Sequence, residues 1–422
     1  MSRQGSERYS KGCAMFRVWV LISSIALIGP TIATARVFDF VENDTVDFDF
    51  STRRGLRLRF EDPKIELRVG GRFHYDAVVA EDDQTNIQRF KSDIRRGRLY
   101  LSGKLFDHFR FKIDRELAPD RRGWRNLWAR YRIRSGLSVK VGNLVAPFGM
   151  ESVVASNYST FMERSASSNL SPSFQTGVLV SAKGRFGRRG NRNRWTVSAG
   201  WMMQPLGQSS DDPHGTKHNS FVSRLTFAPL ARKRRVIHLG AAFEYRDVRN
   251  NALYRVSGRP GSSQVRSLLA TGGIPNVVSV IAFGLEGAGI YGPFTLQGEY
   301  MRTTLLRNSG NSDLVFEGGY IQASYVLTGE RRRYSRSSAV IDGVKPRHVW
   351  GAVEVAARFS TLDLDDDTIN GGSMDSWTVG LNWYLRENVR LMFNYISVDA
   401  RIGNPSVSDR PKIGQVRFQV FF

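Results

Sequence analysis

The stretch SDIRRGRLYLSGKLFDHFRFKIDREL, residues 92–117, decides the fold of this chain. From residue 96 onward, polar or basic side chains such as Arg96 and Arg98 alternate with apolar ones such as Leu99 and Leu101. A period of two is typical of β-strands, because successive side chains point to opposite faces. The stretch is therefore predicted to form strands with one apolar face and one basic face.

The same alternation continues through WRNLWARYRIRSGLSVKVGNLVAPFGMES at 124–152, before the segment NYSTFMERSA at 157–166. A soluble sheet presents a face of mixed charge to water, whereas a membrane barrel turns its apolar face to lipid and its polar face to an aqueous channel. The pattern favours the second arrangement. We predict an all-β fold, a transmembrane antiparallel up-and-down β-barrel whose lumen is lined with positive charge.

The N-terminus predicts export. Lys11 and Arg17 precede a short apolar run, and Ala33-Thr34-Ala35 forms an A-x-A cleavage site. Residues 1–35 are therefore predicted to be a secretory signal peptide. The single cysteine, Cys13, lies within it, so the mature chain is expected to have no disulfide and no cysteine-based metal site or nucleophile.

The charge balance is strongly basic. The formal net charge is +22, and the arginines far outnumber the lysines. Guanidinium groups bind phosphate and carboxylate oxygens through two parallel bonds. Because the chain carries an export signal, nucleic acid is not an expected partner, and small inorganic anions are.

The rest of the chain continues the pattern. Residues 36–54 are predicted to be a short periplasmic segment, and residues 55–422 a single barrel domain of about sixteen strands. The stretch from 143 to 174 does not alternate and is expected to be a loop folded into the lumen. Later connections are expected to alternate between tight turns and long loops, the latter at 250–276, 329–347 and 361–375. Arg331, Arg332, Arg333 and Arg336 are expected to be solvated in the second of these loops; the alternatives are that they collect anions at the mouth or bind lipid phosphates.

The last strand, 412–422, alternates to a terminal phenylalanine, Phe422, as outer-membrane barrels do. With RVGGRFHYD at 68–76, IRRGRLYLSGKLFDHF at 94–109, LVAPFGMESVVASN at 144–157, FMERSA at 161–166 and VGLNWYLRENVRLMFNY at 379–395, the chain resembles the phosphate-selective porins O and P. The resemblance implies a sixteen-stranded trimeric barrel in the bacterial outer membrane, with a ladder of arginines that leads anions to a central constriction.

Residue by residue, Arg95 and Arg96 match a basic pair of the family, and Arg164 matches the base on the inward-folded loop. Strand parity predicts that Arg96, and not Arg95, faces the channel. Ser152 stands where the family carries a second base on that loop, and Arg98 and Arg125 stand where members often carry an aromatic residue and an acid.

Rows of basic side chains are the known device of anion pores, since low-dielectric walls focus their field on the water inside. The predicted anion-binding and pore-lining residues are Arg96, Arg98, Arg110, Lys112, Arg130, Arg132, Arg134 and Arg164. For each one the alternative is an ion pair with an acid such as Asp114 or Glu116 that only keeps the lumen hydrated.

Other motifs carry little weight. The match to the dinucleotide-binding motif G-x-G-x-x-G at 287–292 is followed by no helical pattern. The acids from Asp363 to Asp367 lack the glycine and glutamate of a calcium loop. Proline and glycine interrupt the segment from His214 to His218, which argues against a helical metal site. No metal, cofactor or catalytic site is predicted, and an outer-membrane enzyme finds no support.

We therefore expect an outer-membrane channel for passive diffusion of phosphate, pyrophosphate, polyphosphate or chloride, embedded in lipid and lipopolysaccharide as a homotrimer. The alternatives are a general, weakly anion-selective porin without phosphate preference and, from another class, an exported polyanion-binding protein.

Overall fold

The computed structural model describes residues 46–51, 55–81, 90–186, 193–206, 217–249, 253–308, 310–403 and 407–422. The predicted signal peptide, 1–35, and the segment 211–216 lie outside these ranges. Among the described residues, no helix is long and apolar enough to cross a membrane.

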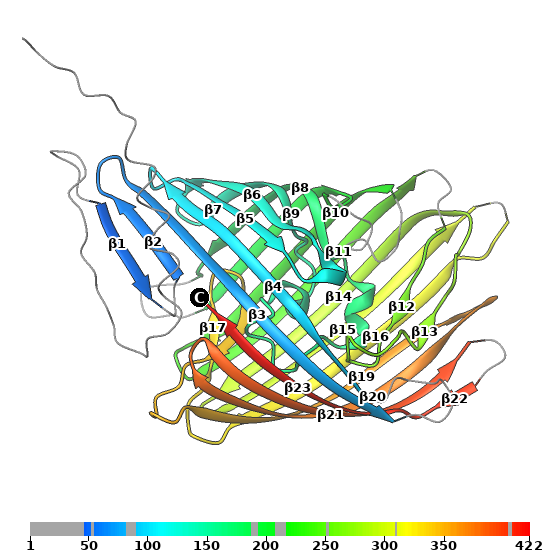
Figure 1. Cartoon of the computed structure of the whole chain (residues 1–422). Helices are drawn as coiled ribbons and strands as arrows, with labels where there is room; N and C mark the ends of the chain where they lie inside the picture. Colours follow the sequence, from blue (N-terminus) through cyan, green and yellow to red (C-terminus); the bar gives the residue numbers. More distant parts are fainter. Residues whose placement is uncertain are drawn as a thin grey trace, which may run out of the picture.

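Sixteen antiparallel strands form a closed barrel (Figure 1), as the sequence predicts. They are β3 (Ile65–Glu81), β4 (Phe90–Leu105), β5 (Phe109–Glu116), β6 (Gly123–Arg134), β7 (Leu137–Val145), β8 (Phe174–Gly184), β9 (Arg194–Met203), β10 (Lys217–Ala231), β11 (Arg235–Arg249), β14 (Val277–Tyr291), β15 (Phe294–Arg307), β16 (Leu314–Val326), β19 (Ala352–Asp366), β20 (Ile369–Arg386), β21 (Val389–Ile402) and β23 (Lys412–Phe421). The ring closes where β23 pairs with β3, from Lys412 opposite Glu81 to Phe421 opposite Arg72.

Successive side chains along each strand alternate between the inside and the outside of the barrel, as a period of two requires. Along β21, Arg390 and Asn394 are buried inside the barrel, whereas Phe393 and Tyr395 are exposed on its outer wall. Large apolar side chains are exposed in this way on strands all around the barrel. They form the apolar surface that a transmembrane barrel turns to lipid.

A hairpin extends the sheet at one end of the barrel. β1 (Val46–Ser51) pairs with β2 (Gly55–Phe60), and β2 pairs with the first residues of β3, before the segment of β3 that meets β23. The hairpin projects beside the C-terminus in Figure 1. Part of the segment 36–54 therefore belongs to a strand of the same sheet.

The connections do not alternate as expected. Residues 361–375 are mostly strand, because β19 and β20 continue to a tight turn at Asp367, so the loop predicted there is wrong. The acidic residues in this segment interrupt the apolar pattern, so the sequence does not show that the strands continue through it. The long connection around 329–347 joins β16 to β19 at the end that holds the C-terminus and the tight turns, which is the periplasmic end of such barrels.

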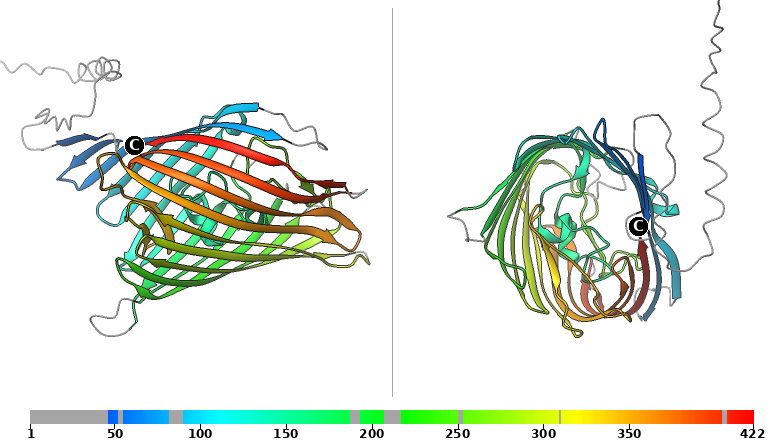
Figure 2. Two further views of the ribbon diagram at one scale, coloured as in Figure 1. Left: turned by 90° about the horizontal axis from the view of Figure 1, so that it is seen from below. Right: turned by 90° about the vertical axis from the view of Figure 1, so that its left-hand side faces the viewer.

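Two segments fold into the lumen. One is the inward loop, residues 146–173, with the short helices α1 (Met150–Val153) and η2 (Ala166–Leu170). The other is the inward hairpin, formed by β17 (Arg332–Ser335) and β18 (Val340–Val344). The view along the barrel in Figure 2 shows segments of the chain inside the ring of strands.

The remaining elements are small. They are η1 (Pro119–Arg121), β12 (Ser257–Gly258), β13 (Leu269–Ala270) and β22 (Val407–Asp409). The inward loop and the inward hairpin pack on each other through Met150, Val154, Val340 and Ile341, against Val236 of β11. This contact fills one side of the lumen and leaves the other side open.

Candidate functional site: the basic lumen

The open side of the lumen is a cavity of about 980 Å³ lined by β3 to β10, the inward loop, the turn of the inward hairpin and residues of several connections between strands. Its described lining carries thirteen arginines and three lysines but only two acids, Asp107 and Glu163. All eight residues predicted from the sequence line this cavity: Arg96, Arg98, Arg110, Lys112, Arg130, Arg132, Arg134 and Arg164. The structure therefore brings the eight residues to one cavity, and their role in binding anions stays a prediction.

Strand register brings basic residues side by side. Arg110 of β5 lies directly opposite Arg130 of β6, and Arg130 lies directly opposite Lys140 of β7. Arg132 and Arg134 continue the inner face of β6. These five residues are called the basic wall below. Directly opposed side chains on neighbouring strands lie about 5 Å apart, and like charges there destabilise the sheet.

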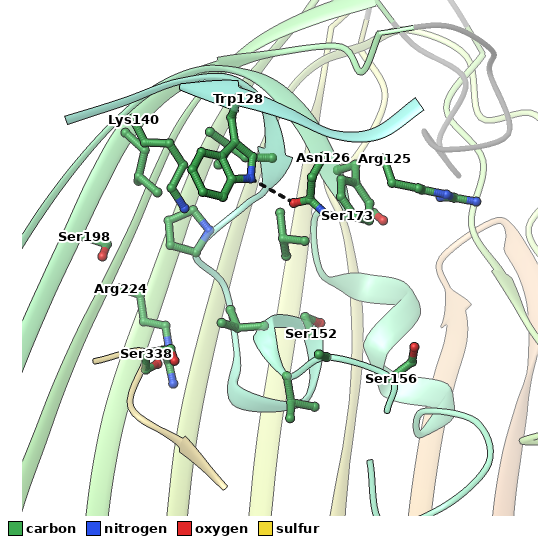
Figure 3. Close-up of a pocket in the computed structure, with 18 of the residues that line it drawn as sticks. Arg125, Asn126, Trp128, Lys140, Ser152, Ser156, Ser173, Ser198, Arg224 and Ser338 are labelled. Atoms are coloured by element: carbon green, nitrogen blue, oxygen red, sulfur yellow. Dashed lines mark hydrogen bonds between the residues drawn. The ribbon is translucent and has the colours of Figure 1, made fainter. Parts of the chain in front are cut away.

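The basic wall has no acidic partner among the described residues: no carboxylate lies within ion-pair distance of Arg110, Arg130, Arg132, Arg134 or Lys140. Lys140 instead places its Nζ 4.9 Å from the centre of the Trp128 ring. Figure 3 shows these two side chains above the inward loop. The charge of the wall therefore has no counterion among the residues that the structure describes.

Several arginines elsewhere around the lumen are paired with acids. Arg224 binds Glu286 at 2.6 Å and Arg332 binds Glu354 at 2.6 Å, and all four side chains are buried. Arg332 was expected to be solvated. That expectation is wrong, because the hairpin that carries it folds into the barrel instead of into solvent.

Two of the eight predicted residues are also paired. Arg98 Nε donates to Glu116 Oε2 at 2.6 Å, and Lys112 Nζ lies 3.5 Å from Asp114 and 4.6 Å from the centre of the Tyr100 ring. The alternative interpretation of a hydrated ion pair therefore describes these two residues better than it describes the basic wall.

Arg95 faces the lumen, contrary to the parity prediction. The β3–β4 pairing shifts between His74 opposite Arg96 and Tyr75 opposite Ile94, which leaves Arg95 as the extra residue of a bulge. A bulge re-aims the side chains beside it. Both Arg95 and Arg96 consequently line the cavity.

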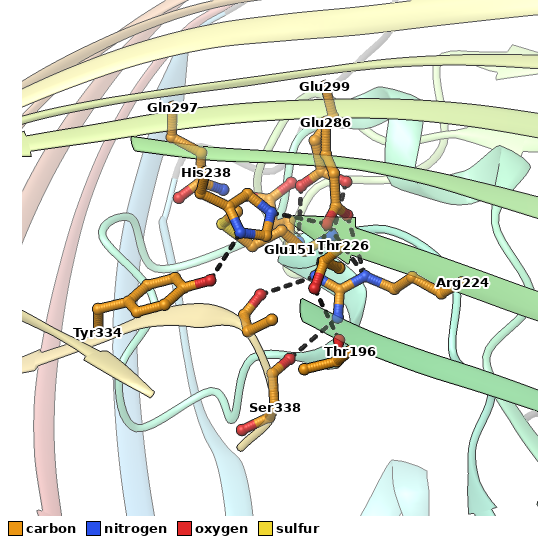
Figure 4. Close-up of polar contacts among 12 residues, drawn as sticks. Glu151, Thr196, Arg224, Thr226, His238, Glu286, Gln297, Glu299, Tyr334 and Ser338 are labelled. Carbon is orange, nitrogen blue, oxygen red and sulfur yellow. Dashed lines mark hydrogen bonds and ion pairs between the residues drawn. The ribbon is translucent and has the colours of Figure 1, made fainter. Parts of the chain in front are cut away.

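The inward loop is held by carboxylates. Glu299 on β15 accepts the backbone N–H groups of Met150 and Glu151 at 2.9 and 2.6 Å. Gly149 permits this approach, because it has a φ of 69° and a Cβ there would lie 2.5 Å from a Glu299 oxygen. Figure 4 shows Glu299 and Glu286 above the loop.

The turn of the loop that carries Arg164 is fixed by Glu151. One Glu151 oxygen accepts Ser165 N and Oγ at 3.0 and 2.8 Å, and the other lies 3.2 Å from Arg358 Nη1. Arg164 itself donates to the carbonyl of Ser152 at 2.7 Å and is exposed to the lumen. The loop thus presents Arg164 to the cavity from a rigid base.

Glu163 meets two guanidinium groups. Arg95 Nε and Nη2 each donate to one of its oxygens at 2.7 Å, and Arg417 Nη2 donates at 2.8 Å. Although burial alone would raise the pKa of the Glu163 carboxyl, Arg95 and Arg417 hold it well below its usual range. The carboxylate is therefore charged wherever the protein is folded near neutral pH.

Several lining residues were not predicted from the sequence. They are Arg72, Arg121, Arg125, Lys140, Lys183, Arg224 and Arg259. Strand parity could have found Lys140, which alternates with Val139 and Val141. Arg121 and Arg259 lie outside the barrel strands, and only the fold of the chain brings them to the cavity.

No group of three or more metal-binding side chains occurs in the part of the chain that the structure describes.

The comparisons with known proteins agree with this architecture. The family model for phosphate-selective porins O and P matches residues 67–422. Porin O of Pseudomonas aeruginosa is 24% identical over 395 residues, which cover 84% of this chain and 88% of that protein.

Two solved structures share the fold. An anion-selective porin from Comamonas acidovorans superposes with a TM-score of 0.54 at 13% identity, covering 85% of this chain and 100% of that chain. OmpT of Vibrio cholerae, in its trimer form, gives a TM-score of 0.54 at 12% identity, covering 85% of this chain and 99% of that chain. The chain therefore belongs to the phosphate-selective porin O and P family and is a β-barrel porin of the outer membrane.

Proposed function

We propose that this porin is an anion-selective channel for the passive diffusion of phosphate and related oxyanions. The observation that carries the proposal is the basic wall, five cations on β5, β6 and β7 with no carboxylate within ion-pair distance among the described residues. Opposed like charges cost stability, and a chain that keeps them in a water-filled lumen gains from the anions they attract. The function of a channel of this family is transport, and no reaction is assigned to it.

The pairing of other lumen arginines supports the same conclusion. Several arginines that contact the inward loop or hairpin have a buried acid partner, as Arg224 has Glu286 and Arg332 has Glu354. Those pairs hold the constriction in place. Anions are attracted only on the opposite side, where the cations are free to exchange water for a passing ion.

Arginine also suits oxyanions in particular. Arg96, Arg110, Arg130, Arg132, Arg134 and Arg164 are the predicted residues without an ion-pair partner among the described residues, and each is an arginine. A guanidinium group binds two oxygens of one phosphate through parallel hydrogen bonds, and it gives a spherical chloride no such advantage.

Single-channel recording in planar bilayers tests the proposal. In a potassium chloride gradient the reversal potential is expected to favour chloride, and added phosphate, pyrophosphate or sulfate is expected to block the chloride current. A reversal potential that favours potassium would end the proposal.

A general, weakly anion-selective porin is the second candidate. It is favoured by Ser152, which stands at the family's second basic position on the loop and is buried against the Ser171 hydroxyl at 2.7 Å. The loop therefore supplies one cation, Arg164, where the family pattern has two. If phosphate reduced the chloride current no more than other added anions do, that result would favour this candidate.

We also propose a homotrimer in contact with outer-membrane lipid and lipopolysaccharide. The apolar outer wall supports the lipid contact, and the family resemblance supports the trimer. Cross-linking in detergent, followed by gel electrophoresis of unheated and heated samples, measures the number of chains. A particle of one chain only would contradict the trimer.

A further inference from the structure

One acidic residue lies in the basic lining of the cavity, close to the predicted anion-binding residues. Of the two acids in the described lining, Asp107 lies in the turn after β4 and binds Lys104, whereas Glu163 lies on the inward loop beside Arg164. Glu163 is thus the acid at the constriction side of a cavity that is otherwise lined by cations.

Its carboxylate occupies the position that a bound oxyanion would take. Arg95 offers Nε and Nη2 to the two Glu163 oxygens at 2.7 Å each, the two-bond geometry by which arginine holds carboxylate or phosphate. Arg96 is adjacent, and its Nε has no hydrogen-bond partner among the residues described. Without Glu163, the group of Arg95 and Arg96 would be a strong oxyanion site within the permeation path.

The loop does not depend on this carboxylate for its position. Arg358 donates to the backbone carbonyl of Glu163 at 3.1 Å, Arg417 donates to the carbonyl of Met162, and Glu151 fixes the following serines. Arg417 also keeps its own buried partner, Asp76, through two contacts of 2.6 Å. The Glu163 side chain is therefore available for a role other than holding the fold.

We propose that Glu163 determines how tightly the channel holds its ions: it is a tethered carboxylate that occupies the two donors of Arg95 and prevents permeant oxyanions from being retained there. Conduction requires that an ion binds well enough to enter and weakly enough to leave. By occupying the strongest potential site, Glu163 keeps anion binding in the weak range. This inference rests on the proposed function, since it assumes that anions pass the constriction.

The experiment compares Glu163→Ala with a matched control, Asp107→Ala, which removes the other lumen acid and the same charge. Chloride current is recorded in planar bilayers while inorganic phosphate is added, and conductance is measured as potassium chloride is raised. In Glu163→Ala, half-block of the chloride current is expected at an about tenfold lower phosphate concentration, because one more charge-assisted contact becomes available to phosphate. The conductance is also expected to saturate at a lower chloride concentration. Asp107→Ala is expected to stay within about twofold of the wild type.

Two further variants secure the interpretation. Glu163→Gln keeps the size of the side chain and is expected to show a smaller shift in the same direction, so it tests the inference if Glu163→Ala does not fold. The double variant Glu163→Ala/Arg95→Gln is expected to lose most of the tighter block, because the two Arg95 donors are gone and Arg417 keeps its pair with Asp76.

Unchanged or weaker block in both Glu163 variants would overturn the inference, as would an equal gain in Asp107→Ala. These outcomes differ from failure of the proposed function, which appears in the wild type as a reversal potential that favours cations.

Discussion

Reversal of one charge in the basic wall separates its contribution to transport from its contribution to stability. Arg130 of β6 lies between Arg110 and Lys140, directly opposite each of them. Arg130→Glu replaces two opposed like-charge pairs by two opposed pairs of unlike charge. Each such pair contributes about 0.2–1 kcal/mol, so the variant is expected to unfold at a higher temperature than the wild type.

Transport should change in the opposite direction. An anion about 5 Å from a unit charge in water gains about 0.8 kcal/mol, and reversal changes the charge by two units, or about 1.7 kcal/mol in total. That energy corresponds to roughly a fifteenfold lower anion population beside residue 130. We therefore expect the ratio of chloride to potassium permeability to fall about tenfold.

The assay is the reversal potential in a potassium chloride gradient, with the unfolding temperature taken from heat-modified gel migration. Arg115→Glu is the matched control, because Arg115 lies on neighbouring β5 but is exposed on the outer face, against the Trp124 ring. The control changes net charge equally and should leave selectivity unaltered. An Arg130→Glu channel that remains as anion-selective as the wild type would refute the role of the basic wall.

The remaining predictions concern the inward segments. Gly149→Ala places a Cβ at a φ of 69°, against a Glu299 oxygen, and is expected to loosen the loop. Single-channel recording should then show a larger and noisier current, and a current equal to that of the wild type would contradict this prediction. The pKa of Glu163 is depressed in the folded state, so its pair with Arg95 contributes stability above the ordinary glutamate pKa, and this contribution is lost only as pH falls through the lower folded value. Sulfate block of the chloride current should therefore stay constant from pH 7 to about 4.3, and block that tightens near pH 6 would contradict this. Glu354→Gln leaves buried Arg332 without its carboxylate and should lower the free energy of unfolding by about 3–5 kcal/mol, measured by heat or denaturant. The control Asp399→Asn, from a solvent-exposed ion pair, should lower it by under about 1 kcal/mol. Equal losses in the two variants would show that burial is not decisive.

The parity of side chains explains which site residues the sequence could identify. Arg110, Arg130 and Arg132 occur in regular stretches of strand, so alternation alone assigns them to the inner face. Arg95 fails this rule because one extra residue in β4 shifts the alternation, and a bulge leaves no clear pattern in the sequence.

The pairing of charges could not be predicted in the same way. Arg332 and Glu354 are 22 residues apart, and Arg417 and Asp76 are 341 residues apart. Composition shows an excess of cations but does not say which of them meet an acid. That depends on closure of the barrel and on which end of it a loop enters, as the inward hairpin demonstrates.

The sequence by itself determined the barrel, its strand number and the sign of its lumen, because a period of two and an apolar outer face are local properties of each strand. Only the tertiary structure decided which arginines are neutralised and which stay open to passing ions. Ion pairing depends on distances of a few ångströms between residues far apart in the chain, and those distances exist only after the ring has closed around the inward loop and hairpin.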